Sequence, residues 1–169
     1  TLATTLIDAF LKGKPKEQLL QCLAKSFHAA VQAKALVPYL NSEHQEQVFI
    51  AALLRNIGEL ALLSSGREAV EKFVTARDLD PDNEQAISQE YLGVDINLIN
   101  KNLIKDWALD ELTREVVDNN SNYNNMSRAI NIGNDLSKYI HKGLNSSEMG
   151  HIYAQVASLC DITVDAAKK

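Results

Sequence analysis

The feature that most constrains this fold is a long apolar stretch in the first half of the chain, at residues 43–65. From Val48 onward nearly every position is apolar, and only Arg55, Asn56 and Glu59 interrupt the run. A helix without a polar stripe has to be covered on every side, so the stretch predicts one central helix inside a globular core. The three polar groups need partners there, because an unsatisfied buried group costs about 1–3 kcal/mol.

The rest of the sequence predicts an all-α protein. The chain has 169 residues, of which 46% are hydrophobic and 23% charged, as in ordinary globular proteins. It has three prolines and seven glycines, and its lack of alternating apolar and polar runs leaves few signals for strands. We therefore expect one domain over residues 1–169, a multi-helix globular bundle around the buried central helix.

Apolar periodicity and end signals give approximate bounds for the helices. Ser42 with Gln45, and Asn145 with Glu148, have the spacing of capping boxes, and Gly93 stands where a left-handed C-cap is expected. The expected helices cover residues 2–12, 15–37, 43–65, 67–77, 82–92, 95–107, 110–117, 127–141 and 149–159.

Small residues indicate where helices approach closely. The second expected helix has a run of alanines that would let a neighbouring helix come near, at Ala24, Ala29, Ala30, Ala33 and Ala35. Gly58 lies within the central helix, where glycine costs about 1 kcal/mol relative to alanine. We expect either a close contact or a kink at this glycine.

Composition excludes several classes of function. The net charge is -5 and no cluster of Lys or Arg stands out, so we expect no nucleic-acid binding. The sequence has no uninterrupted run of about 18 apolar residues, so we expect no membrane span. The N-terminal residues lack the pattern of a signal peptide. Two distant cysteines, Cys22 and Cys160, form no disulfide framework, which favours the cytoplasm and core positions for both.

No sequence motif nominates a catalytic site. None of His28, His44, His141 and His151 has a second histidine at i+3 or i+4, the spacing that would bring two metal ligands to one helix face. The sequence also lacks GxGxxG, a P-loop, a nucleophile elbow and HExxH. A Ser-His-Asp site is not excluded by spacing, since such triads assemble in space. We expect no cofactor and no metal.

Three blocks of the sequence together resemble a known family. AALLRNIGELAL (51–62) resembles the core motif of the HD superfamily, which reads roughly aGLLHDIGkL. EYLGVDINLINKNLIKDWALDELTREVVDNN (90–120) and AINIGNDLSKYI (129–140) resemble the blocks that follow it. Their order and spacing are similar to those of HDOD domains, relatives of HD phosphohydrolases found mainly in bacterial signalling proteins. The positions that fall into register are Glu90, Gly93, Trp107, Leu109 and Asn134.

The chain departs from the HD pattern at the metal-ligand positions. The resemblance places Arg55 and Asn56 where HD hydrolases have a His-Asp pair, and Lys25 where they have an earlier histidine. It also places Ile96, Asn119 and Asn120 at other histidine positions. A guanidinium or an isoleucine side chain has no lone pair for a metal. The resemblance thus implies a vestigial pocket formed by Lys25, Arg55, Asn56, Glu59, Ile96, Asn119 and Asn120.

These observations lead to one main expectation and two alternatives. The main one is a non-catalytic regulatory or protein-interaction module in bacterial signal transduction, with other signalling proteins or domains as partners and an open oligomeric state. The chain would be the HD-like C-terminal portion of an HDOD domain and a fragment of a longer protein. One alternative is a divergent phosphohydrolase that uses Asp95, Asp118 or Asp135. The other is a sensor whose Arg55 and Lys25 bind a small anion.

The contacts of Arg55 follow from the same resemblance. One hypothesis pairs Arg55 with Glu59, one turn further along the helix. Another has Arg55 hydrogen-bond Asn119, Asn120 or nearby carbonyl groups as a structural plug.

Overall fold

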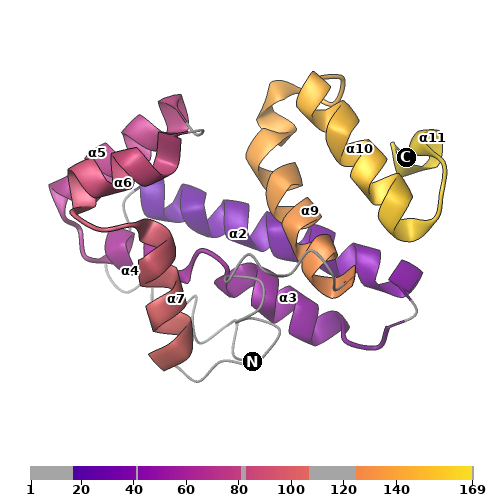
Figure 1. Cartoon of the computed structure of the whole chain (residues 1–169), viewed down its shortest axis with the longest axis horizontal. Helices are drawn as coiled ribbons and strands as arrows, with labels where there is room; N and C mark the ends of the chain where they lie inside the picture. The colour runs from indigo at the N-terminus through magenta and orange to yellow at the C-terminus, as the bar shows by residue number, and fades with distance from the viewer. Residues whose placement is uncertain (1–16, 41, 81–82, 107–124, 169) are drawn as a thin grey trace. The chain divides into compact units, whose positions relative to one another are not determined.

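The computed structural model describes residues 17–40, 42–80, 83–106 and 125–168. All regular structure in these residues is helical and none is a strand, which confirms the all-α prediction (Figure 1). The chain divides into two compact units, each described here by itself. The first unit comprises residues 1–24 and 56–109, and the second comprises 25–55 and 110–169. The expected helices at 2–12 and 110–117 lie outside the described residues.

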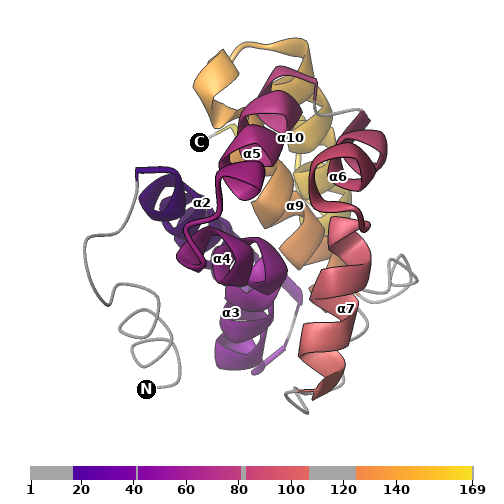
Figure 2. The same ribbon diagram turned by 90° about the vertical axis from the view of Figure 1, so that its left-hand side faces the viewer.

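The core of the first unit is formed by four helices and the start of α2 (Glu17–Leu36). These helices are α4 (Ile57–Ser64), α5 (Glu68–Leu79), α6 (Glu84–Leu92) and α7 (Ile96–Asp106). Helix α5 packs against α6, and α4 against α7 (Figure 2). The buried side chains that these helices share are Leu19, Cys22, Leu60, Leu63, Val70, Phe73, Val74 and Ile96.

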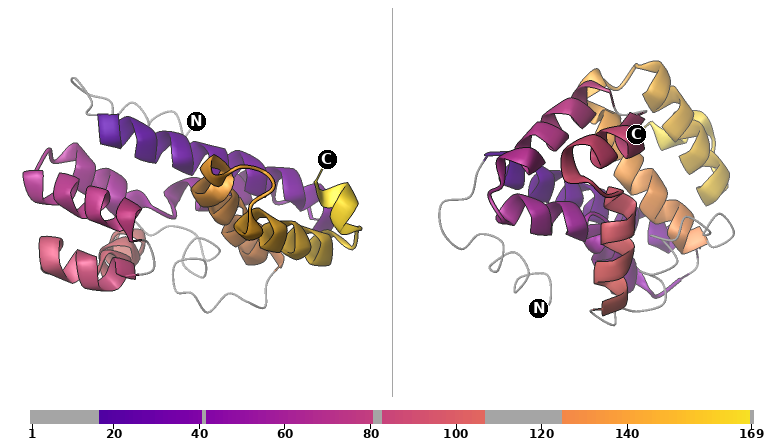
Figure 3. Two further views of the ribbon diagram at one scale, coloured as in Figure 1. Left: turned by 90° about the horizontal axis from the view of Figure 1, so that it is seen from above. Right: turned by 60° about the vertical axis from the view of Figure 1, so that its left-hand side comes forward.

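The second unit contains the rest of α2 and the helices of its two segments, residues 25–55 and 110–169. These are η1 (Val37–Leu40), α3 (Gln45–Leu54), α9 (Asn125–Tyr139), η3 (Ile140–Lys142), α10 (Ser147–Cys160) and α11 (Val164–Ala167). Helix α9 lies beside α10 (Figures 1 and 3) and also packs on α3. The core here is formed by Ala129, Ile132, Met149, Ile152, Tyr153, Val156, Leu159 and Cys160.

Small residues bring α9 against α2 within the second unit, as the alanine run predicts. A Cβ atom built on Gly133 would overlap the Ala29 carbonyl oxygen and lie 2.9 Å from the Ala33 backbone nitrogen. The hydroxyl of Ser137, one turn further along α9, donates to the Lys25 carbonyl oxygen at 2.7 Å. Gly133 and Ser137 thus hold one side of α9 against α2, and helical spacing places Asn131 and Asp135 on the opposite side.

The expected single central helix is wrong, because the chain forms two helices, α3 and α4, with a break at residues 55–56. Asn56 leaves the helical conformation, with φ -106° and ψ 29°, and its carbonyl accepts the first hydrogen bond of α4 from Leu60 at 3.1 Å. The buried amide of Gly58 donates to Asn100 Oδ1 on α7 at 2.6 Å. Asn100 thus satisfies one of the N–H groups that a new helix start exposes. The close contact expected at Gly58 is confirmed, whereas the break lies before this glycine, at residues 55–56.

Two expected helix caps are wrong and one is confirmed. His44 is the N-cap of α3 and makes no side-chain capping bond, whereas the Ser42 hydroxyl accepts from the His44 amide at 3.3 Å. The N-cap of α10 is Ser146 rather than Asn145, and its hydroxyl accepts from Met149 N at 3.3 Å. Gly93 does end α6, in the left-handed conformation with φ +72°.

No single helix in the described ranges is long and apolar enough to cross a membrane. Helices α3 and α4 meet that criterion only when taken together, by length and composition, and they are separated by the break at residues 55–56.

Candidate functional site

The second unit holds a polar cluster at the junction of α3 and α9. Arg55 follows the last residue of α3, is half-buried, and donates from Nη1 to Asn131 Oδ1 on α9. Asn131 is itself half-buried, so the pair lies at the edge of the core rather than in bulk water. A guanidinium stays protonated at any working pH, so Arg55 carries its positive charge in this contact.

Asp135 is the titratable group of this cluster, one helical turn beyond Asn131. Burial raises the pKa of the Asp135 carboxyl above its usual 3.8, although the charge of Arg55 and, to a lesser degree, that of Lys138 lower it. A hydrogen bond from Asn134 and the charge of His151 act in the same lowering direction but do not outweigh burial. Desolvation therefore governs this carboxylate in spite of its cationic neighbours. A perturbed carboxyl beside a fixed cation is a candidate functional feature.

The first unit holds a buried ion pair between α4 and α5. Glu59 is 8% exposed. Its carboxylate accepts two hydrogen bonds from Arg77: one from Nη1, and one from Nη2 at 3.1 Å. The Arg77 guanidinium also lies 5.5 Å from the ring centre of Phe73. Burial alone would lower the pKa of Arg77, but the charge and hydrogen bonds of Glu59 raise it. This bidentate pair is the geometry that Arg and carboxylate groups favour.

Two of the three polar residues of the central stretch have side-chain partners in these contacts. Glu59 is bonded to Arg77, and Arg55 to Asn131. Sequence reasoning missed both partners. The only available signal for Arg77 was that a buried glutamate needs a cation, and that signal does not say which cation.

The residues of the expected vestigial pocket are divided between the two units. Lys25 and Arg55 belong to the second, where the side chain of Lys25 is exposed. Asn56, Glu59 and Ile96 belong to the first, where Ile96 is 3% exposed and packs in the hydrophobic core. Asn119 and Asn120, together with the hypothesis that they bond Arg55, lie outside the described residues. Inside its own unit Ile96 acts as a core residue.

The residues of the family signature have separate local roles. Gly93 caps α6, and the loop after it is held by Ser88, whose hydroxyl donates to the Val94 carbonyl at 2.6 Å and accepts from Ile96 N at 2.8 Å. Glu90 is exposed on α6, and Asn134 is half-buried on α9. Trp107 and Leu109 lie outside the described residues.

The described cysteine and histidine side chains form no cluster that resembles a metal or catalytic site. Cys22 and Cys160 are both buried in hydrophobic cores, as expected. Burial raises the pKa of the Cys160 thiol, which disfavours its reactive thiolate form. His44, His141 and His151 are exposed, while His28 is half-buried with Nε2 3.4 Å from the Gln32 amide nitrogen. Among the described residues, no three His, Cys, Asp or Glu side chains gather as metal ligands would.

The remaining aspartates of the enzyme alternative differ in environment. Asp95 Oδ1 accepts from the backbone amide of Asn97 at 2.8 Å, the contact of a residue that caps the start of α7. Asp118 lies outside the described residues. Asp135 has a carboxyl whose pKa is raised by burial, and Arg55 is its cationic neighbour.

Comparison with solved structures first defines the class of protein. The chain is similar to the crystal structure of a protein named "putative phosphohydrolase" from Shewanella amazonensis SB2B, with a TM-score of 0.70 and 20% sequence identity. The alignment covers 99% of this chain and 64% of that one, so this chain spans less than two thirds of the length of its structural neighbour. At this identity the likeness shows a shared fold, the HD-like all-helical architecture.

The family follows from the sequence model that matches. The model of the HDOD domain matches residues 1–123, which is most of the chain. The chain belongs to the HDOD domain family, as the three sequence blocks predict. No curated protein matches the sequence.

Proposed function

We propose that this HDOD chain is a non-catalytic module that acts by binding other proteins in bacterial signal transduction. The observation that carries the proposal is the environment of Arg55. At a position where the family resemblance would place a metal-binding His, the chain has a permanently charged guanidinium that is bonded to Asn131. A positive charge without a lone pair both fails to bind a divalent cation and repels it.

The arrangement of acidic groups supports the same proposal. A hydrolytic metal centre needs several donors converging on one ion. In the described ranges, Glu59 is committed to Arg77 and Asp95 to the start of α7. Asp135 has Arg55 as a charged neighbour. We infer that the chain regulates or recruits partners in the cytoplasm, as the HD-like part of a longer protein.

Metal analysis combined with a hydrolase assay tests the proposal. The purified chain is incubated with Mn²⁺, Fe²⁺, Ni²⁺ or Mg²⁺, dialysed, and assayed on phosphomonoester and phosphodiester substrates. We expect neither stoichiometric metal nor turnover above that of the Asp135→Asn variant. Retained metal together with activity that Asp135→Asn removes would establish the enzyme alternative instead.

The sensor alternative has its own experiment. Its specific support is that Arg55 is only half-buried and that Lys25, in the same unit, is exposed. Calorimetric titration with inorganic phosphate and with nucleotides distinguishes the two functions. Binding that is lost in Arg55→Gln and kept in the matched surface variant Arg67→Gln would favour a sensor of small anions. Absence of heat with all probes would leave the protein-interaction proposal in place.

A further inference from the structure

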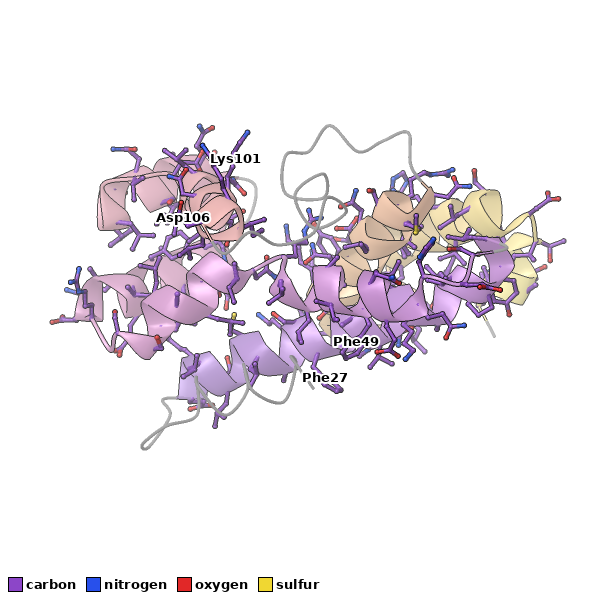
Figure 4. The ribbon with its side chains drawn as sticks, turned by 90° about the horizontal axis from the view of Figure 1, so that it is seen from below. Phe27, Phe49, Lys101 and Asp106 are labelled. Atoms are coloured by element: carbon purple, nitrogen blue, oxygen red, sulfur yellow. The ribbon has the colours of Figure 1, made fainter. Side chains whose placement is uncertain are left out.

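We draw no further inference here: the strongest candidate, the surface patch of the second unit where the exposed Phe27 on α2 meets Phe49 on α3 edge to face (Figure 4), carries none because nothing in the described residues shows what covers it.

Discussion

The two units differ in how their partly buried charged groups are compensated. In the first, the buried carboxylate of Glu59 is paired with the half-buried guanidinium of Arg77, which also lies 3.2 Å from Asp78 and 3.7 Å from Glu84. In the second, Arg55 is bonded to a neutral amide, and Asp135 is desolvated more than its cationic neighbours compensate. A matched pair contributes to one well-defined arrangement, whereas an unmatched carboxylate costs stability. We therefore expect removal of the Glu59 charge to destabilise the first unit and removal of the Asp135 charge to stabilise the second.

The largest effect should come from breaking the pair in the first unit. Glu59→Ala leaves the Arg77 guanidinium, whose side chain is 14% exposed, without its main counter-charge. Removing one partner of a buried pair costs roughly 3–5 kcal/mol. The free energy of unfolding from urea titration measures this loss, and hydrogen exchange in α4 and α5 locates it.

Two variants make that result specific to burial. Glu68→Ala removes the partner of Lys72 in an exposed pair and should change nothing measurable. Glu59→Leu combined with Arg77→Met replaces both charges by apolar side chains and should recover most of the stability. A double variant as unstable as Glu59→Ala would show that the pair has a role that apolar packing cannot replace.

The next largest effect concerns the packing that positions the polar cluster of the second unit. Gly133→Ala places a Cβ atom against backbone atoms of Ala29 and Ala33, which cannot move without shifting α2. Overpacking of this kind costs about 1–3 kcal/mol. The control is Gly150→Ala on α10, where a Cβ meets nothing within 4 Å and alanine should stabilise by roughly 0.5–1 kcal/mol. Equal effects at the two glycines would contradict a close approach of α9 to α2.

A smaller loss is expected where α4 begins. Asn100→Ala removes the acceptor of the Gly58 amide in the first unit and leaves that amide buried. An unsatisfied buried group costs about 1–3 kcal/mol, and a water molecule entering the space would reduce the loss. Exposed Asn102→Ala on the same helix serves as the control. Exchange of the Gly58 amide that is no faster in Asn100→Ala would show that the contact does not protect α4.

The sequence predicted the buried stretch and one of the three expected caps, and it missed the contacts that depend on distant partners. The apolar run gave a buried central stretch, and the position of Gly93 gave a left-handed cap. The amide of Gly58 near the start of α4 is bonded to Asn100, which lies 42 positions further along the chain.

Distance along the chain also explains why the sequence did not predict the partners of Glu59 and Arg55. The partner of Glu59 is 18 positions away and that of Arg55 is 76 positions away. Helical periodicity reports which face is buried, and it carries no information about which polar groups meet across that face. The family resemblance located Arg55 and Glu59 but gave neither partner.

The smallest effect should be a gain of stability in the second unit. The folded state raises the pKa of Asp135, so it binds this proton more tightly than the unfolded chain does. The stabilisation from the proton is present below the unfolded pKa and is lost as pH rises through the folded value. Asp135→Asn should therefore be more stable than the natural chain at neutral pH. The difference should vanish toward acid pH, where Asp135 is protonated in both states.

Hydrogen exchange of α9 and α10 between pH 4 and 7 measures this difference, after correction for the intrinsic rate of exchange. Asp165→Asn is the matched control, because the side chain of Asp165 is 91% exposed on α11. A natural chain that gains stability relative to Asp135→Asn as pH rises would mean that Arg55 and Lys138 outweigh burial. The cluster would then resemble the matched pair of the first unit, and the contrast between the two units would disappear.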